Sequence, residues 1–85
     1  MKKFATEMIG MAVFSHKGEQ LGLLNNYVVD TNTGDLIHIL VDAAEAIEAR
    51  RFRIDSQDRL VLPFKNIVSI KDVIVVRTKT PKQFS

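Results

Sequence analysis

Short runs of alternating apolar and polar residues follow one another along most of the chain. The longest extended run is Glu19 to Asp30, and another, Leu36 to Asp42, follows it after the polar connection Thr31-Asn-Thr-Gly-Asp35. Two such runs around a short Gly-containing connection predict a β-hairpin. In the second run the β-branched residues share one face, which we expect to be the core face: Ile37, Ile39 and Val41.

Shorter runs of the same kind predict further strands at 11–14, 51–54, 59–64, 67–70 and 73–76. On both sides of a predicted turn at 55–58 the apolar positions are even and share one face: Phe52, Ile54, Leu60, Leu62 and Phe64. Pro63 has no amide hydrogen and marks a strand end or edge. These runs amount to six or so short strands. Closing a small sheet on itself removes its open edges, so we predict an all-β fold, a small six-stranded antiparallel β-barrel.

Two segments do not follow the strand pattern. Thr6 is positioned to cap one helical turn over Glu7 to Ile9, which Gly10 would end. Residues 43–50 are rich in Ala and Glu but too few for a stable isolated helix, so we expect a connection with at most one or two helical turns. Ile47 would anchor this connection. We predict a single domain over residues 1–77 and a basic C-terminal tail over 78–85.

Composition and charge exclude several classes of protein. The chain has 85 residues, no Cys and a net charge of +2. A disulfide framework and a Cys zinc site are therefore excluded, and we expect a cytoplasmic protein. No apolar run approaches the ~20 residues of a membrane-spanning helix, which predicts no direct membrane insertion. A domain of this size has a small hydrophobic core and leaves much of its surface exposed, so a partner or a second copy is expected to cover part of that surface.

Candidate catalytic groups are sparse. His16 falls in a predicted turn and His38 in a predicted strand, far from any carboxylate cluster in the sequence. Most Asp residues fall at strand ends and turns, where Asp side chains bond their own backbone. The chain has no nucleophile elbow, phosphate loop or dinucleotide fingerprint. We predict a protein that is not an enzyme and that has no metal site and no cofactor.

The long strand points instead to an interface. Neither of its two phases is cleanly polar, which is typical of a strand that is covered on both sides, bulged or part of an interface. If the β-branched face of its partner points inward, the opposite face gathers an apolar patch around a histidine: Leu23, Tyr27, Leu36, His38 and Leu40. Such a patch predicts a protein partner, most simply in a homodimer. The alternative is that the 43–50 segment or the N-terminal turn covers it.

A second possible surface is basic. Arg51, Arg53 and Arg59 would form a stripe on the outer face of the predicted 51–64 hairpin, which raises the alternative of an RNA-binding protein. Nearby acidic residues are close enough in sequence to neutralise this stripe, and the small net charge also disfavours nucleic acid.

Several short motifs resemble those of the PRC-barrel domain family. They are Ile9-Gly10 with Val13, Gly18-Glu-x-Leu-Gly22, Val28-x-Asp30, Thr33-Gly34-Asp35, Leu62-Pro63-Phe64, Asn66-Ile-Val-Ser-Ile70 and Asp72-Val-Ile-Val-Val76. Their order resembles that of the stand-alone archaeal members in particular.

The resemblance implies a six-stranded barrel without catalytic residues. Relatives of this type occur in the photosynthetic reaction-centre H subunit and in the ribosome maturation factor, where the barrel serves assembly. The short archaeal members are similar to dimeric adaptors of the tubulin-like cell-division machinery. The resemblance therefore implies an accessory factor of archaeal cell division or, alternatively, a factor for RNA processing or ribosome maturation.

Overall fold

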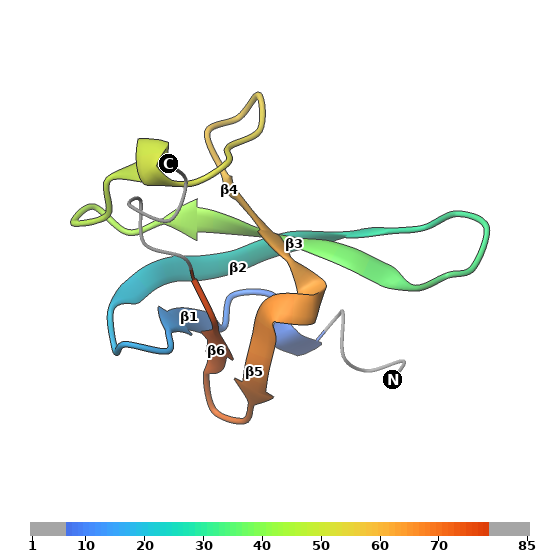
Figure 1. Ribbon diagram of the computed structural model, residues 1–85, viewed down its shortest axis with the longest axis horizontal. Helices are drawn as coiled ribbons and strands as arrows, with labels where there is room; N and C mark the ends of the chain where they lie inside the picture. The colour runs from blue at the N-terminus through green and yellow to red at the C-terminus, as the bar shows by residue number, and fades with distance from the viewer. Residues whose placement is uncertain (1–6, 79–85) are drawn as a thin grey trace.

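The computed structural model describes residues 7–78, and these form one six-stranded sheet (Figure 1). The strands are β1 (Ala12–Ser15), β2 (Gln20–Val29), β3 (Leu36–Ala43), β4 (Leu60–Pro63), β5 (Ile67–Ile70) and β6 (Ile74–Val76). Two 3₁₀ turns, η1 (Ala49–Arg51) and η2 (Phe64–Asn66), interrupt them. None of the helical segments within residues 7–78 has the length and apolar character that a bilayer crossing requires. The predicted all-β class is confirmed.

The strands lie in the order β4-β3-β2-β1-β6-β5. All neighbouring pairs are antiparallel except β1 and β6, which run parallel with Val13 opposite Ile74. The prediction of a wholly antiparallel barrel is therefore wrong at this pair. The sheet is also not closed by hydrogen bonds, because β4 and β5 are its two edges. These edges are consecutive in the chain, and η2 turns the corner between them, so the sheet curls into a barrel-like shape (Figure 1).

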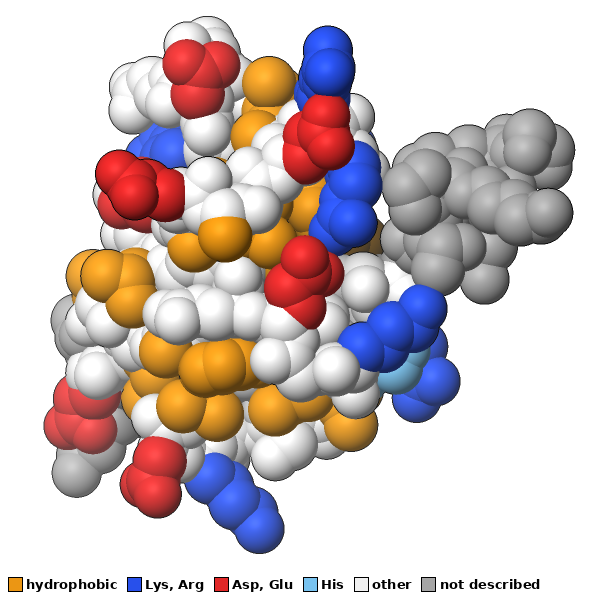
Figure 2. Space-filling view, turned by 90° about the vertical axis from the view of Figure 1, so that its left-hand side faces the viewer, with side chains coloured by type: hydrophobic (Ala, Val, Ile, Leu, Met, Phe, Trp, Pro, Cys, Tyr) orange, Lys and Arg blue, Asp and Glu red, His pale blue; other side chains and the backbone are white. Residues whose placement is uncertain are grey.

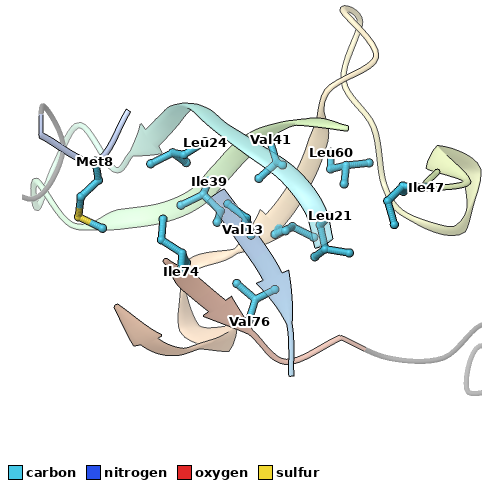
Figure 3. Packing of buried hydrophobic residues seen from close by; sticks show 11 residues of the cluster. Met8, Val13, Leu21, Leu24, Ile39, Val41, Ile47, Leu60, Ile74 and Val76 are labelled. Atoms are coloured by element: carbon cyan, nitrogen blue, oxygen red, sulfur yellow. The ribbon is translucent and has the colours of Figure 1, made fainter. Parts of the chain in front are cut away.

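The core lies inside this curl and draws residues from β1 to β4, from β6 and from the connections (Figure 3). Its fully buried members are Val13, Leu21, Ile39, Val41, Leu60, Ile74 and Val76. The predicted core face of β3 is thus confirmed at two of its three positions. Ile37 is 43% exposed: the register between β2 and β3 shifts at this residue, which leaves it without a partner on β2, and β4 pairs with β3 only from His38 onward. Ile47 is buried and anchors the 43–50 connection, as expected.

Two predictions about local structure need comment. The N-terminal turn closes with a 2.9 Å hydrogen bond from the Met11 amide to the Met8 carbonyl, whereas its expected cap, Thr6, lies outside the described residues. The predicted strand at 51–54 is wrong. Arg51 belongs to η1, and within residues 51–54 only Ile54 forms a bridge, with Leu60. Ile54 is consequently 41% exposed, although it shares the even apolar phase with the buried Leu60.

A glycine at one end of the β2–β3 ladder allows the sheet to curl. Gly22 has a φ of +154°, and a Cβ at this position would lie 1.9 Å from the carbonyl oxygen of Asp42. Glycine inside a strand permits this close approach of two backbones, because any Cβ atom at the position would overlap the neighbouring strand. The strands therefore lean together at Gly22 and give the sheet its curvature.

Candidate functional site

The predicted interface residues lie on the β2–β3 hairpin, and a bulge divides them between its two faces. β2 slips by one residue against β3 at Asn25. Side chains of directly paired residues point to the same face of a sheet. Tyr27 is paired with the fully buried Ile39 and so lies on the core side, whereas Leu23 is paired with the exposed Asp42. The prediction that Leu23 and Tyr27 share one outer face is therefore wrong.

The predicted residues of β3 are more buried than expected. Leu40 is only 9% exposed, and Leu36 is half-buried with its side chain packed against the core. His38 is also half-buried. Among the five predicted residues, all within the described part of the chain, Leu23 alone is largely exposed, at 47%. The outer apolar patch expected from the alternation does not form.

A different apolar surface lies at the far end of the same hairpin, residues 26–37, which we call the distal hairpin. β1 pairs with β2 only between Gln20 and Leu23, and β4 does not reach beyond His38 of β3. Within residues 7–78 the distal hairpin thus has two open strand edges, and it extends beyond the other strands (Figure 1). Its exposed apolar residues are Val28, Val29 and Ile37, between 37% and 43% exposed. Open edges with exposed β-branched side chains favour pairing with another chain.

The residues around the Asn25 bulge form a polar network. The Arg59 guanidinium donates 2.7 Å hydrogen bonds to Asn25 Oδ1 and to Asp55 Oδ2, and Asn25 Nδ2 donates to Asp42 Oδ2 at 3.0 Å. The backbone N–H of Arg59 also donates to Asp55, and this bond is the main reason that the pKa of Asp55 lies below its usual value. Arg59 is therefore committed to this network and does not join Arg51 and Arg53 in the predicted basic stripe.

Arg51 and Arg53 belong instead to a cavity of about 560 Å³, which we call the basic pocket. Its lining residues come from η1 and the chain after it, from β3, β4 and η2, and from the end of β6: His38, Arg51, Phe52, Arg53, Val61, Leu62, Pro63, Lys65, Asn66, Arg77 and Thr78. Four of these residues are cationic, and none is acidic. Elsewhere the charges are mixed: Figure 2 shows acidic and basic side chains interspersed over the face that it views.

Arg51 has an unusual environment at the wall of this pocket. Its Nη2 donates to Glu19 Oε1 at 3.1 Å, and its guanidinium carbon lies 5.2 Å from the centre of the Phe52 ring. Its Nε is buried but has no hydrogen-bond partner in the structure. A buried hydrogen-bond donor without a partner destabilises the fold. Because Arg51 lines the basic pocket, a ligand bound there could supply the missing acceptor.

Comparison with known proteins assigns the family. A model described as PRC-barrel domain matches residues 1–82. The chain belongs to the PRC-barrel domain family. Among curated proteins, this PRC barrel is 29% identical over 65 residues to the uncharacterized protein MJ1118 of Methanocaldococcus jannaschii, a match that covers 76% of the chain and 70% of that protein.

A solved structure shows the same fold. The PRC barrel superposes with a TM-score of 0.58 on a Pseudomonas aeruginosa protein described as a 16S ribosomal RNA processing protein, RimM, at 17% identity. The match covers 86% of this chain but only 42% of that longer protein. At this identity the likeness establishes the fold, and it confirms the predicted PRC-barrel architecture.

The titratable residues of the PRC barrel are scattered. Residues 7–78 contain no cluster of three or more His, Cys, Asp or Glu side chains that could hold a metal ion. His16 Nδ1 accepts a 3.2 Å hydrogen bond from the Thr78 amide, which ties the turn after β1 to the end of β6. His38 lies apart from it, in the wall of the basic pocket. The two histidines therefore have separate structural surroundings.

Sequence reasoning missed two members of the basic pocket, Lys65 and Arg77. They are brought together because the Arg77 amide donates a 2.8 Å hydrogen bond to the Asn66 carbonyl, which joins the end of β6 to η2. This contact continues the antiparallel ladder of β5 and β6 one step beyond the pair Ile67 and Val76. Pairing the predicted strands at 67–70 and 73–76 as a hairpin would have placed Arg77 beside Asn66.

Proposed function

We propose that this PRC barrel is a non-enzymatic protein-interaction module that pairs with a second copy of itself through the distal hairpin. The observation that supports this most directly is the open edge of β2 beyond β1, next to the exposed Val28 and Val29. One strand edge can pair antiparallel with the same edge of a second copy across a two-fold axis. Such pairing would satisfy the open backbone groups and cover the β-branched side chains at once.

In this proposal the dimer works in the cytoplasm as an adaptor, and its remaining surface binds another protein. The narrower role expected from the resemblance is that of an accessory factor of archaeal cell division. A fluorescent fusion of the chain, expressed in its native host, should then gather at the division site. A uniform distribution through dividing cells would contradict this narrower role.

Light scattering coupled to size exclusion tests the self-pairing. The wild-type chain, of 9.6 kDa, should elute with twice that mass. The double variant Val29→Lys, Ile37→Lys places charge on the distal hairpin and should elute as a monomer with an unchanged circular-dichroism spectrum, because lysine on an edge strand opposes pairing.

The matched control is Val68→Lys on β5, where the native side chain is 52% exposed and far from the distal hairpin in the sheet order. This variant should remain dimeric. A monomeric wild type, or a double variant that keeps the wild-type mass, would refute the proposed interface.

A second candidate function is RNA processing or ribosome maturation. It is supported by the likeness to the protein described as RimM and by the cationic side chains of the basic pocket. Binding to RNA should then be measurable at low salt and should fall steeply as salt rises, because phosphate contacts release counterions. Absence of binding at low salt would exclude this function.

A further inference from the structure

The basic pocket has two chemically different parts. The side chains that carry charge are Arg51, Arg53, Lys65 and Arg77, and the apolar part is formed by Phe52, Val61, Leu62 and Pro63. Its volume of about 560 Å³ lies within the range of ~300–1,000 Å³ that is usual for ligand sites. The pocket can therefore hold a bulky apolar side chain together with flanking groups.

The charge of the pocket is not balanced by the protein. Arg53, Lys65 and Arg77 form no ion pair with any carboxylate in residues 7–78. Arg51 does pair with Glu19, but its buried Nε has no partner. Cations gathered around a concave surface without counter-charges attract an anionic ligand and strengthen its binding.

We propose that the basic pocket binds an acidic peptide segment of a partner protein, with one large apolar side chain seated on the apolar part and carboxylates paired with the surrounding cations. The proposal rests on the protein-interaction role above and specifies the chemistry of the partner. Charge complementarity of this kind raises the association rate and selects acidic partners. An apolar anchor in a pocket supplies most of the affinity of a small interface.

The pocket is less suited to single-stranded nucleic acid. Such binding relies on aromatic rings that are free to stack against bases. Phe52 is the only Phe, Tyr or Trp in the lining, and its ring is already in contact with the Arg51 guanidinium. A small inorganic anion would also leave the apolar part of the pocket unused.

Fluorescence anisotropy with the full chain tests the proposal. The probe is a labelled peptide, Asp-Glu-Asp-Phe-Asp-Glu-Asp, and its matched control carries Ala in place of Phe. The wild-type chain should bind the Phe peptide more tightly than the Ala peptide, and raising the salt should weaken both. The variant Lys65→Glu, Arg77→Glu should bind the Phe peptide at least about tenfold more weakly, since it reverses two of the four cations.

The control variant is Lys17→Glu, Lys71→Glu, which makes the same change in net charge at two exposed positions outside the pocket. It should bind within about twofold of the wild type. Circular dichroism checks that each variant is folded.

Three outcomes would overturn the proposal: no binding of the acidic peptide, equal binding of the Phe and Ala peptides, or an equal loss in both double variants. Tighter, pocket-dependent binding of a labelled oligouridine would overturn it in favour of RNA. A monomeric wild type that binds the peptide through the pocket contradicts self-pairing but supports the pocket. A dimer that does not bind the peptide contradicts the pocket alone.

Discussion

Replacing Gly22 with Ala would place a methyl carbon 1.9 Å from the carbonyl oxygen of Asp42 and 2.9 Å from Cγ1 of Val41. Carbon and oxygen atoms in sheets approach to about 3.3 Å at closest, so β2 and β3 would have to separate locally by roughly 1.4 Å. The obstacle is backbone, which a rotamer change cannot relieve. Separation weakens the pairing of Gly22 with Ala43 and the 2.8 Å hydrogen bond from the Ala44 amide to the Leu21 carbonyl.

Each backbone hydrogen bond contributes about 1 kcal/mol, and the unfavourable φ adds a further ~1 kcal/mol. We therefore expect Gly22→Ala to lower the free energy of unfolding by about 2–4 kcal/mol, out of the roughly 4–13 kcal/mol typical of a chain of this length. Urea unfolding followed by circular dichroism measures the loss.

The control for this experiment is Gly34→Ala. Gly34 also has a positive φ, +80°, but a Cβ there would meet no atom within 4 Å. It should therefore lose only about 1 kcal/mol, the cost of the left-handed conformation alone. If Gly22→Ala proves no more destabilising than Gly34→Ala, the close approach of the two strands is not what requires glycine.

Two further predictions concern stability. Leu60→Ala should lower the free energy of unfolding by about 2–5 kcal/mol because Leu60 is fully buried, whereas Val68→Ala, at a site 52% exposed, should change it by about 0.5 kcal/mol or less; equal losses in urea unfolding would contradict the placement of the core. Asp55→Asn should be destabilising at about pH 7, and its deficit relative to the wild type should shrink as pH falls below about 4, since the lowered pKa of Asp55 makes its stabilisation present above the unfolded value of 3.8 and lost as the carboxylate is protonated. A deficit that stays constant between about pH 7 and about pH 2 would show that the Asp55 charge contributes nothing.

The hairpin and most of the core could be predicted from the sequence because their determinants are local. Alternation on either side of Thr31-Asn-Thr-Gly-Asp35 identifies β2, β3 and the turn between them. The β-branched phase of β3 correctly predicts the burial of Ile39 and Val41. The same logic failed at Ile37, because the register between β2 and β3 shifts there and β4 ends at His38, and alternation along β3 indicates neither.

The interface was mispredicted for a related reason. A strand alternates strictly only while its register holds, and the extra residue at Asn25 reverses the phase of everything after it. The Asn25 side chain is hydrogen-bonded to Asp42 and Arg59, which lie 17 and 34 residues away in the sequence. The bulge is therefore set by tertiary contacts, and alternation along β2 could not place Leu23 and Tyr27 on opposite faces.

The parallel pairing of β1 with β6 has a consequence for how the protein folds during synthesis. The β2–β3 hairpin is contiguous in the chain and can form as soon as residues 20–43 have left the ribosome. β1, however, acquires its second neighbour only when β6 has been made, so the sheet remains incomplete until then. Pairing segments so far apart is slow, since the loop between them must close before their contacts stabilise it. Until β6 has been synthesised, the nascent chain exposes an unpaired edge of β1. A chaperone that binds unpaired strand edges is expected to act on the chain during this interval.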